Sequence, residues 1–292
     1  MKVLAVATIA AVATVVAADY KCVPNPPAPS YDCPASAVAC TNNPLTGLPY
    51  DSCCVADQGL MVFAQNWTAG YCLSSAPNHY CAPSTLSHLP DHKFTVHGLW
   101  PDYCNGSYSN SDLGCDPTRR YTDVPARIMG ADSDLYGKLQ KMWMGADGSY
   151  DWFWSHEFVK HGTCDSQLNP KCYTNYKPNE EIVDYTRRIY SLWKEFDLFA
   201  AFKKHGIVPS NTTTYKFSAM QAALKAEFGY EGAIQCVTDS QKNKYLSEIW
   251  MYLMNVAGNK FIHHEPVAAY NGCLSTNQTD ADIYYPPQPS RG

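Results

Sequence analysis

The cysteines constrain the fold of this chain more than any other residue type, since 13 of its 292 residues are cysteine. They contain no short CxxC pair, and the adjacent Cys53 and Cys54 cannot hold a zinc ion in that pattern. In an exported chain, cysteines at this density predict a disulfide framework. Their odd number leaves one thiol that is free or bonded between chains, and Cys22 is the candidate.

The first 18 residues predict export. Lys2 precedes an unbroken run of small apolar residues that ends at Ala18, before Asp19. This layout is typical of a secretory signal peptide cleaved after Ala18, and a signal anchor is the alternative. The run is short for a membrane span, so we expect residues 19–292 to be soluble and not membrane-associated. Their expected location is the medium or the lumen of a vacuole or lysosome.

Composition limits the kinds of partner. At 46% hydrophobic residues the chain can bury a core, which excludes a disordered protein. The formal charge is −5, so the surface has no general attraction for nucleic acid, and chemistry on nucleic acid would depend on a few local cations. In an exported protein, N-linked glycans are expected at Asn-X-Ser/Thr sequons, which begin here at Asn66, Asn105, Asn211 and Asn277.

Hydrophobic periodicity predicts strands and helices without βαβ regularity, which indicates a single domain of the α+β class. A Pro- and Cys-rich segment over residues 19–50 is expected to be loop-like, and residues 276–292 to be a loose tail. The predicted strands are 60–67, 93–100, 244–255 and 260–266, and the predicted helices are 181–206 and 218–229, each closed by a glycine.

Four titratable residues fall on one face if the segment after Trp154 is helical. At about 100° per residue, His156, Glu157, Lys160 and His161 lie within an arc of roughly 140°. Two imidazoles, a carboxylate and an ammonium group can meet an anionic substrate and transfer protons on it. A second segment, residues 94–102, contains His97 and Trp100 and is also a candidate for chemistry.

Two other interpretations of this face compete. A zinc hydrolase places its histidines four residues apart, whereas His156 and His161 are five apart and cannot easily hold one ion, so no metal is expected. A solvated helix with an incidental Glu157–Lys160 pair is the commoner explanation of such charges. The flanking aromatic residues, such as Trp154 and Phe158, favour a helix packed against a core instead.

Together, HGLWPD (97–102) and HEFVKHGTC (156–164) resemble the two active-site segments of the ribonuclease T2 family. The likeness extends over nearly the whole chain after the signal peptide. Phe158 stands where the family usually has tryptophan, which is an exchange of one aromatic residue for another. The resemblance implies a central, mostly antiparallel sheet flanked by helices and stapled by disulfide bonds.

The resemblance also implies an activity, namely endonucleolytic cleavage of single-stranded RNA with low base specificity. The ribose 2′-hydroxyl would attack the phosphate, giving 2′,3′-cyclic phosphate ends and then 3′-phosphate ends. His161 would be the general base and His97 the general acid, while His156 would hold the phosphate. Glu157 and Lys160 would stabilise the transition state, so no metal or cofactor is needed. Two histidines predict a bell-shaped pH profile with an acidic optimum, and a monomer that forms no stable nucleic-acid complex is expected.

In fungal members of the family, the primary base site is an aromatic sandwich with an acidic partner. The matching positions here are Trp100, Asp102 and Tyr108, although Tyr108 by itself reads as an ordinary loop residue. Stacking accepts any base, and the Asp102 carboxylate could bias the site towards adenine. Gln65 and Phe153 fall where relatives have the second base site.

The family pattern further implies which cysteines pair, with one short local pair left over. The implied disulfide bonds are Cys33–Cys54, Cys40–Cys104, Cys53–Cys172, Cys115–Cys164 and Cys236–Cys273, and the remaining pair is Cys72–Cys81. A secreted metalloprotease and an inactive relative with a storage, binding or signalling role are the rival functions. The second of these usually lacks an active-site histidine, but this chain keeps all three.

Overall fold

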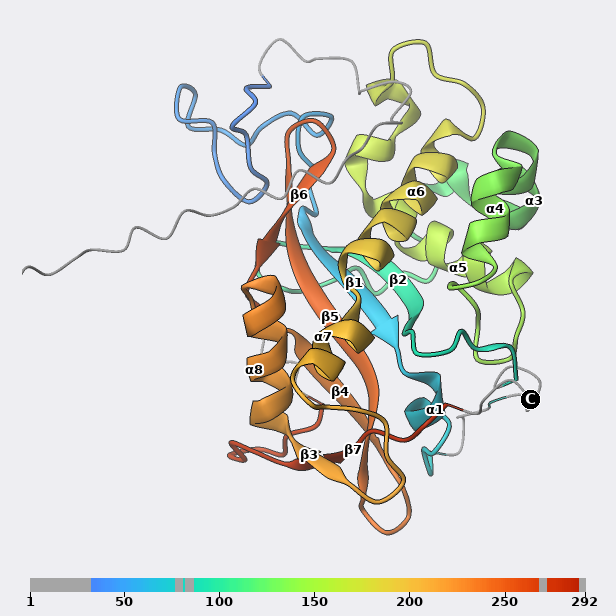
Figure 1. Ribbon diagram of the computed structural model, residues 1–292. Coiled ribbons are helices and arrows are strands. Elements are labelled where there is room, and N and C mark those ends of the chain that lie inside the picture. Colours follow the sequence, from blue (N-terminus) through green and yellow to red (C-terminus); the bar gives the residue numbers. More distant parts are fainter. Residues whose placement is uncertain (1–32, 77–80, 82–86, 268–271, 289–292) are drawn as a thin grey trace, which may run out of the picture.

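A seven-stranded sheet flanked by helices forms the protein (Figure 1). The computed structural model describes residues 33–76, 81, 87–267 and 272–288, so the predicted signal peptide and Cys22 lie outside the described residues. The strands follow the order β2-β1-β5-β7-β3, with β4 and β6 also paired to β5. Every pairing is antiparallel except the short contact between β5 and β7. The α+β prediction is confirmed.

The bounds of the elements are as follows. The strands are β1 (Leu60–Asn66), β2 (Thr95–Asp102), β3 (Thr214–Lys216), β4 (Ala233–Thr238), β5 (Lys244–Val256), β6 (Lys260–His264) and β7 (Asp282–Tyr284). The α-helices are α1 (Thr68–Tyr71), α3 (Val124–Ala131), α4 (Ser133–Leu139), α5 (Asp151–Lys160), α6 (Glu180–Glu195), α7 (Leu198–Lys204) and α8 (Phe217–Phe228). Short 3₁₀ turns are η1 (Pro117–Arg119), η2 (Gly162–Cys164), η3 (Ser166–Leu168) and η4 (Pro170–Cys172).

Two expectations from the sequence differ in detail from the structure. The predicted helix over 181–206 is two helices, α6 and α7, because Phe196 turns into the core and the Asp197 side chain caps α7 at Ala200 N, 3.2 Å away. The C-terminal tail is not loose throughout, since it contains β7. Tyr285, which follows β7, is fully buried. Burial of apolar side chains therefore holds this part of the tail against the sheet.

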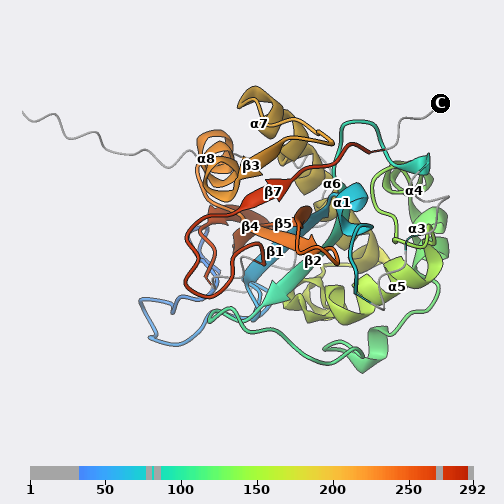
Figure 2. The same ribbon diagram turned by 90° about the horizontal axis from the view of Figure 1, so that it is seen from below.

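The sheet buries a different cluster on each face. One face, with Phe63, Leu99 and Met251, packs in the main core beneath α6 and α7. The other face, with Val62 and Tyr252, packs in a smaller cluster against the N-terminal segment. In Figure 2 the sheet lies between α7 and α8 on one side and the N-terminal loops, drawn in blue, on the other. We call the face of Val62 and Tyr252 the second face.

Among the described residues, six disulfide bonds fasten the loops to this framework. In the Cys40–Cys104 bond, Cys104 lies just after the end of β2. In the Cys115–Cys164 bond, Cys164 lies in η2, just after the end of α5. The other four are Cys33–Cys54, Cys53–Cys172, Cys72–Cys81 and Cys236–Cys273. These are the six pairs that the resemblance and the remaining local pair indicated.

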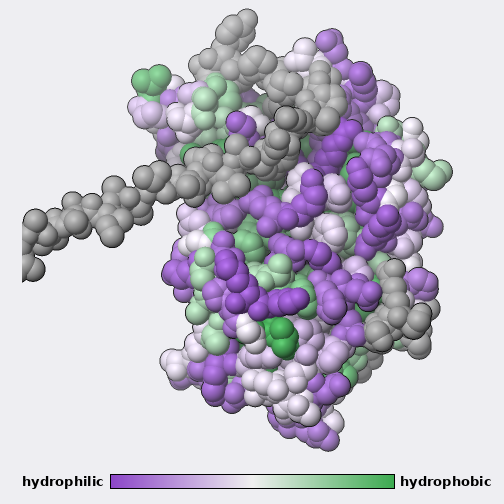
Figure 3. All heavy atoms as spheres, in the orientation of Figure 1, coloured by the Kyte–Doolittle hydropathy of each residue, from purple (hydrophilic) through white to green (hydrophobic). Residues whose placement is uncertain are grey.

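The outer surface is mostly polar on the side seen in Figure 3, where hydrophobic side chains occur in small, separate groups. The large apolar side chains are instead concentrated in the two clusters next to the sheet. Within the part of the chain that the structure describes, no helix combines the length and apolar character needed to cross a bilayer.

Candidate active site

A β-bulge in β2 turns His97 towards the second face of the sheet. Val96 and Gly98 pair with successive residues of β1, so His97 between them is an extra residue in the strand. Simple alternation would place His97 on the face of Leu99, which is buried in the main core. The bulge instead brings it to the face that carries Trp100.

Buried aromatic side chains hold α5 beside β2. The indole Nε1 of Trp154, on α5, donates to the carbonyl of Trp143 at 2.7 Å. Trp143 in turn donates from Nε1 to the His97 carbonyl at 2.8 Å. From α6, the Tyr185 hydroxyl donates to the Leu99 carbonyl at 2.9 Å. These bonds fix the backbone on both sides of the site, because all three rings are almost completely buried.

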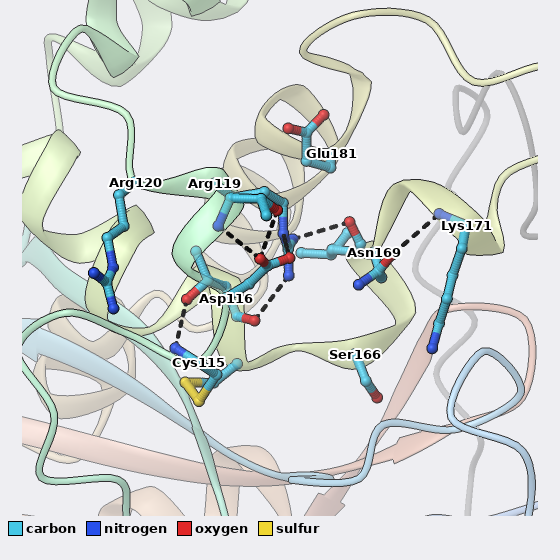
Figure 4. A network of polar contacts seen from close by, with 12 residues as sticks. Cys115, Asp116, Arg119, Arg120, Ser166, Asn169, Lys171 and Glu181 are labelled. Carbon is cyan, nitrogen blue, oxygen red and sulfur yellow. Dashed lines mark hydrogen bonds and ion pairs between the residues drawn. A yellow bond between two sulfur atoms is a disulfide. The ribbon is translucent and has the colours of Figure 1, made fainter.

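The chain that leaves α5 is also fixed. Arg119, which is 2% exposed, donates to the Asp116 carboxylate at 2.8 Å and to the Thr163 carbonyl at 2.8 Å (Figure 4). Its third bond, of 3.1 Å, reaches the Leu168 carbonyl. With the Cys115–Cys164 bond, this network positions the turn directly after His161.

These elements enclose a cavity of about 430 Å³ on the second face. It brings together all the predicted catalytic residues and the predicted primary base site. Its walls are formed by Val62, His97, Trp100, Asp102, Tyr108, His156, Glu157, Lys160, His161, Trp250 and Tyr252. Residues from β1, β2, β5 and α5 therefore meet at one site.

His97 lies between two carboxylates. Its Nδ1 is 2.7 Å from Glu248 Oε1, and its Nε2 is 3.7 Å from Glu157 Oε1. Burial by itself lowers the pKa of an imidazole, but Glu248 and then Glu157 outweigh it and raise the pKa of His97 to about 9. His97 is therefore a cation up to alkaline pH.

Glu157 is 1% exposed and is held by the Trp100 indole, whose Nε1 donates to Oε2 at 3.0 Å. Burial raises the pKa of Glu157 to about 7, although the charge on His97 opposes the rise. Only glycine fits at position 98, because a Cβ there would lie 2.1 Å from Glu157 Oε2 and 2.4 Å from Trp100 Nε1. Gly98 thus permits the carboxylate and the indole to meet.

His161, the residue that caps the C-terminus of α5, has the opposite electrostatic environment. Burial, and then the positive charges of His97 and Lys160, hold the pKa of His161 well below 6.5. Its ring lies 5.3 Å from the Trp100 ring, which is also 4.9 Å from the ring of His97. His161 is therefore a neutral imidazole near neutral pH, in the same cavity as a charged one.

His156 and Lys160 complete the helix side of the site. The ring of His156 stacks on the exposed Trp152 at 4.8 Å, and burial followed by the charge of Lys160 lowers its pKa. The Lys160 ammonium lies 2.8 Å from Oδ1 of Asp112, a loop residue whose side chain is mostly exposed. The ammonium group that faces the cavity thus has a counterion that water can reach.

The predicted primary base site lies at one end of the cavity. Asp102 is 7% exposed, and burial raises its pKa to about 7. Tyr108 is 56% exposed at the rim, which leaves its ring accessible to a ligand. Trp100 contributes its ring to the same wall and makes an edge contact with Trp250 at 5.5 Å.

The predicted second base site is wrong at Gln65. This side chain is 1% exposed and donates from Nε2 to the Phe196 carbonyl at 3.1 Å, which places it on the main-core face. Strand alternation puts Asn66 on the second face instead, opposite Glu248 in the β1–β5 register. Phe153 lies near the site, 6.1 Å from the His97 ring, but is only 7% exposed.

The sequence prediction omitted the contribution of β5. Glu248, Trp250 and Tyr252 alternate along this strand on the second face, and the latter two line the cavity. A signal was present, because a glutamate in an otherwise apolar strand is uncommon unless it has a partner.

The four predicted sequons also differ in setting, since Asn66 is partly buried in the sheet whereas Asn105, Asn211 and Asn277 are exposed. Among the described residues, no group of three or more His, Cys, Asp or Glu side chains could hold a metal ion.

Comparison with known proteins gives consistent matches. The sequence model of the ribonuclease T2 family matches residues 58–277. The chain is 33% identical over 254 residues to Ribonuclease Rh of Rhizopus niveus, covering 87% of this chain and 92% of that protein. It is 32% identical to Ribonuclease Trv of Hypocrea rufa, covering 89% and 99% of the two chains. The crystal structure of Actibind, described as a T2 ribonuclease, matches with a TM-score of 0.69 at 28% identity, covering 88% and 98%.

Proposed function

We propose that this chain, which belongs to the ribonuclease T2 family and is an endoribonuclease, cleaves single-stranded RNA by histidine acid–base catalysis without a metal ion. The observation that carries the proposal is the opposite protonation of two imidazoles in one cavity. The pKa of His161 lies well below 6.5, whereas that of His97 is about 9. Over the pH range between these values, one ring accepts a proton and the other donates one.

The reaction uses a nucleophile that RNA itself carries. His161 takes the proton from the ribose 2′-oxygen as that oxygen attacks phosphorus, and a 2′,3′-cyclic phosphate forms. The bond from phosphorus to the 5′-oxygen breaks, and His97 gives that oxygen its proton. In the second step water attacks the cyclic phosphate with the two roles exchanged, which leaves a 3′-phosphate and restores both rings. Placing nucleophile and phosphate together supplies much of the rate.

Two side chains on α5 act on the phosphoryl oxygens. His156 and Lys160 line the cavity on the helix side, where hydrogen bonds to the phosphate stabilise the charge that develops in the transition state. Glu157 is protonated below a pH of about 7 and can then donate a hydrogen bond as well. Lys160 supplies the positive charge that a metal ion would otherwise provide, and the other two groups add hydrogen bonds.

The base pocket favours stacking over readout of one base. Trp100 and Tyr108 present rings to the ligand, and each base–aromatic stack contributes about 1–3 kcal/mol regardless of base identity. Asp102, which burial keeps protonated below a pH of about 7, loses its O–H donor and becomes a stronger acceptor for an exocyclic amine as the pH rises. We propose low base specificity, with a preference for adenine that grows above this pH.

We also propose that the protein is exported and acts as a monomer. The six disulfide bonds support an oxidising compartment, and all the proposed catalytic groups come from one chain. Glycans are expected at the exposed Asn105, Asn211 and Asn277 and not at the partly buried Asn66.

The test is to incubate the purified protein with a single-stranded RNA and with DNA of the same sequence, both in excess EDTA. The proposal expects RNA fragments that end in 2′,3′-cyclic phosphate, followed by 3′-phosphate, and intact DNA. Loss of RNA cleavage in EDTA would contradict metal independence. Equal cleavage of DNA would show that the 2′-hydroxyl is dispensable.

A further inference from the structure

Glu248 is a buried glutamate in the middle of β5, a strand that is otherwise largely apolar. It is 9% exposed and lies on the second face, across β1 from the bulge at His97. Both of its carboxylate oxygens have close partners in the site. Neither the two motifs nor the family match assigns it a role.

The contacts of Glu248 determine which way the His97 ring points. Its Oε1 is 2.7 Å from His97 Nδ1, and a carboxylate can only accept, so Nδ1 carries a hydrogen and donates it. Nε2 is then the ring nitrogen left for the substrate. The other oxygen, Oε2, accepts from the Trp250 indole at 2.6 Å, and Trp250 lines the cavity. One carboxylate thus fixes the histidine and a wall of the pocket.

We propose that Glu248 is the positioning residue for the general acid, holding His97 doubly protonated with Nε2–H directed at the leaving oxygen. The inference rests on the proposed function, in which His97 is that acid. When Nε2–H passes its proton to the 5′-oxygen, the phosphorus–oxygen bond breaks and His97 becomes neutral. Nδ1–H stays bonded to Glu248 throughout, so the ring keeps its orientation for the reverse transfer. Ring orientation through a carboxylate at the second nitrogen is a general device of histidine catalysis.

Other charged groups face His97 and bear on its protonation. Glu157 approaches Nε2 from α5, but burial raises the pKa of Glu157 to about 7, so below this pH it is mostly neutral. Lys160 lowers the pKa of His97, and the positive charge of His97 in turn bears on His156 and His161. Tyr71, on α1, interacts with Glu248 itself. Glu248, which contacts Nδ1 directly, is therefore the stronger of the two carboxylates that raise the pKa of His97.

The experiment compares kcat/KM for a dinucleotide RNA substrate from pH 4.5 to 9.5 in wild type, Glu248→Gln and Glu248→Asp. Loss of the carboxylate lets the pKa of His97 fall from about 9 towards its ordinary value of about 6.5. Because Glu157 is ionised at pH 8 and still raises this pKa, the loss expected in Glu248→Gln from titration is at most about 30-fold at pH 8 and less than twofold at pH 5.5. Glu248→Asp is expected to retain part of the alkaline activity.

A matched control exists elsewhere in the chain. Glu195 pairs with His263 at 2.7 Å, outside the cavity, so Glu195→Gln removes a similar carboxylate–imidazole contact. It is expected to leave the pH profile unchanged. NMR titration of the His97 ring in Glu248→Gln provides a readout that needs no activity, and its pKa is expected to fall.

The outcomes separate the two proposals. If RNA is cleaved to cyclic phosphate but Glu248→Gln loses activity equally at pH 5.5 and pH 8, Glu248 is only structural and the inference is wrong. The inference is also wrong if the alkaline limb of the pH profile of kcat/KM is at the same pH in Glu248→Gln as in the wild type. If the wild type needs a metal ion or yields no cyclic phosphate, the proposed function itself fails, whatever the variant does. A lowered His97 pKa would then still establish the contact in solution.

Discussion

The strand side and the helix side of the cavity each present a histidine, and their surroundings make the two chemically different. His97, on β2, lies between the carboxylates of Glu248 and Glu157. His161, at the end of α5, is buried and is near two positive charges, those of His97 and Lys160. The pKa of the first is raised to about 9 and the pKa of the second is lowered well below 6.5. In the proposed mechanism, one residue type therefore supplies both the acid and the base.

The protonation of His97 thus depends on a strand that neither motif contains. The charge on His97 depends on β5, which reaches it across β1. The charge on His97 in turn helps to keep His161 neutral. The two sides are coupled, so a change on either is expected to alter the other.

The largest effect is expected from removing either ring. His97→Phe and His161→Phe should each reduce kcat/KM on RNA by at least about 10²–10⁴-fold, because each loses one proton transfer. The matched control is His205→Phe, since the side chain of His205 is 34% exposed, as is that of His97, and also lies 2.8 Å from a glutamate. Near-wild-type cleavage by either active-site variant would break the assignment of roles.

A smaller effect is expected where the two sides touch. Gly98→Ala forces the Glu157 carboxylate or the Trp100 indole aside, because the new Cβ would lie 2.1 Å from Glu157 Oε2. A displacement of about 1 Å in the site should lower activity by about 10²-fold. Gly137→Ala, in α4 with open space around it, is the control and should leave kcat/KM unchanged. If Gly98→Ala folds and retains full activity, close contact of the two sides is not required.

The smallest effect concerns the helix side alone. Asp112→Asn removes the counterion that lies 2.8 Å from Lys160, so the ammonium should bind phosphate more readily. Because water and salt screen this exposed pair, KM should fall by no more than about fivefold, with more effect at low salt. Asp282→Asn removes a comparable surface pair with Lys216 and should not change KM. An increase in KM for Asp112→Asn would show that Asp112 instead holds Lys160 in its working position.

Local spacing was enough to predict the helix side of the site. His156, Glu157, Lys160 and His161 are adjacent along one turn and a half of α5, and helix geometry alone brings them to one face. The strands β1 and β5 also follow from alternation, because each buries one set of side chains against the main core. Such features depend only on residues that are close in the sequence.

The strand side depends on long-range pairing, which periodicity cannot supply. Glu248 reaches His97 only through the register of β5 on β1 and the bulge in β2. The same dependence explains the error at Gln65, because a displacement of one residue changes which face a side chain occupies. Likewise, the break between α6 and α7 depends on a distant contact in the core, where the centre of the Phe196 ring lies 6.1 Å from the centre of the Phe63 ring.

The most direct test of the account is an NMR titration of the imidazole rings of His97 and His161 in the substrate-free protein, assigned with the two Phe variants. We predict that His97 titrates near pH 9 and that His161 titrates well below pH 6.5. Two rings that titrate together near 6.5, or in the reverse order, would contradict it.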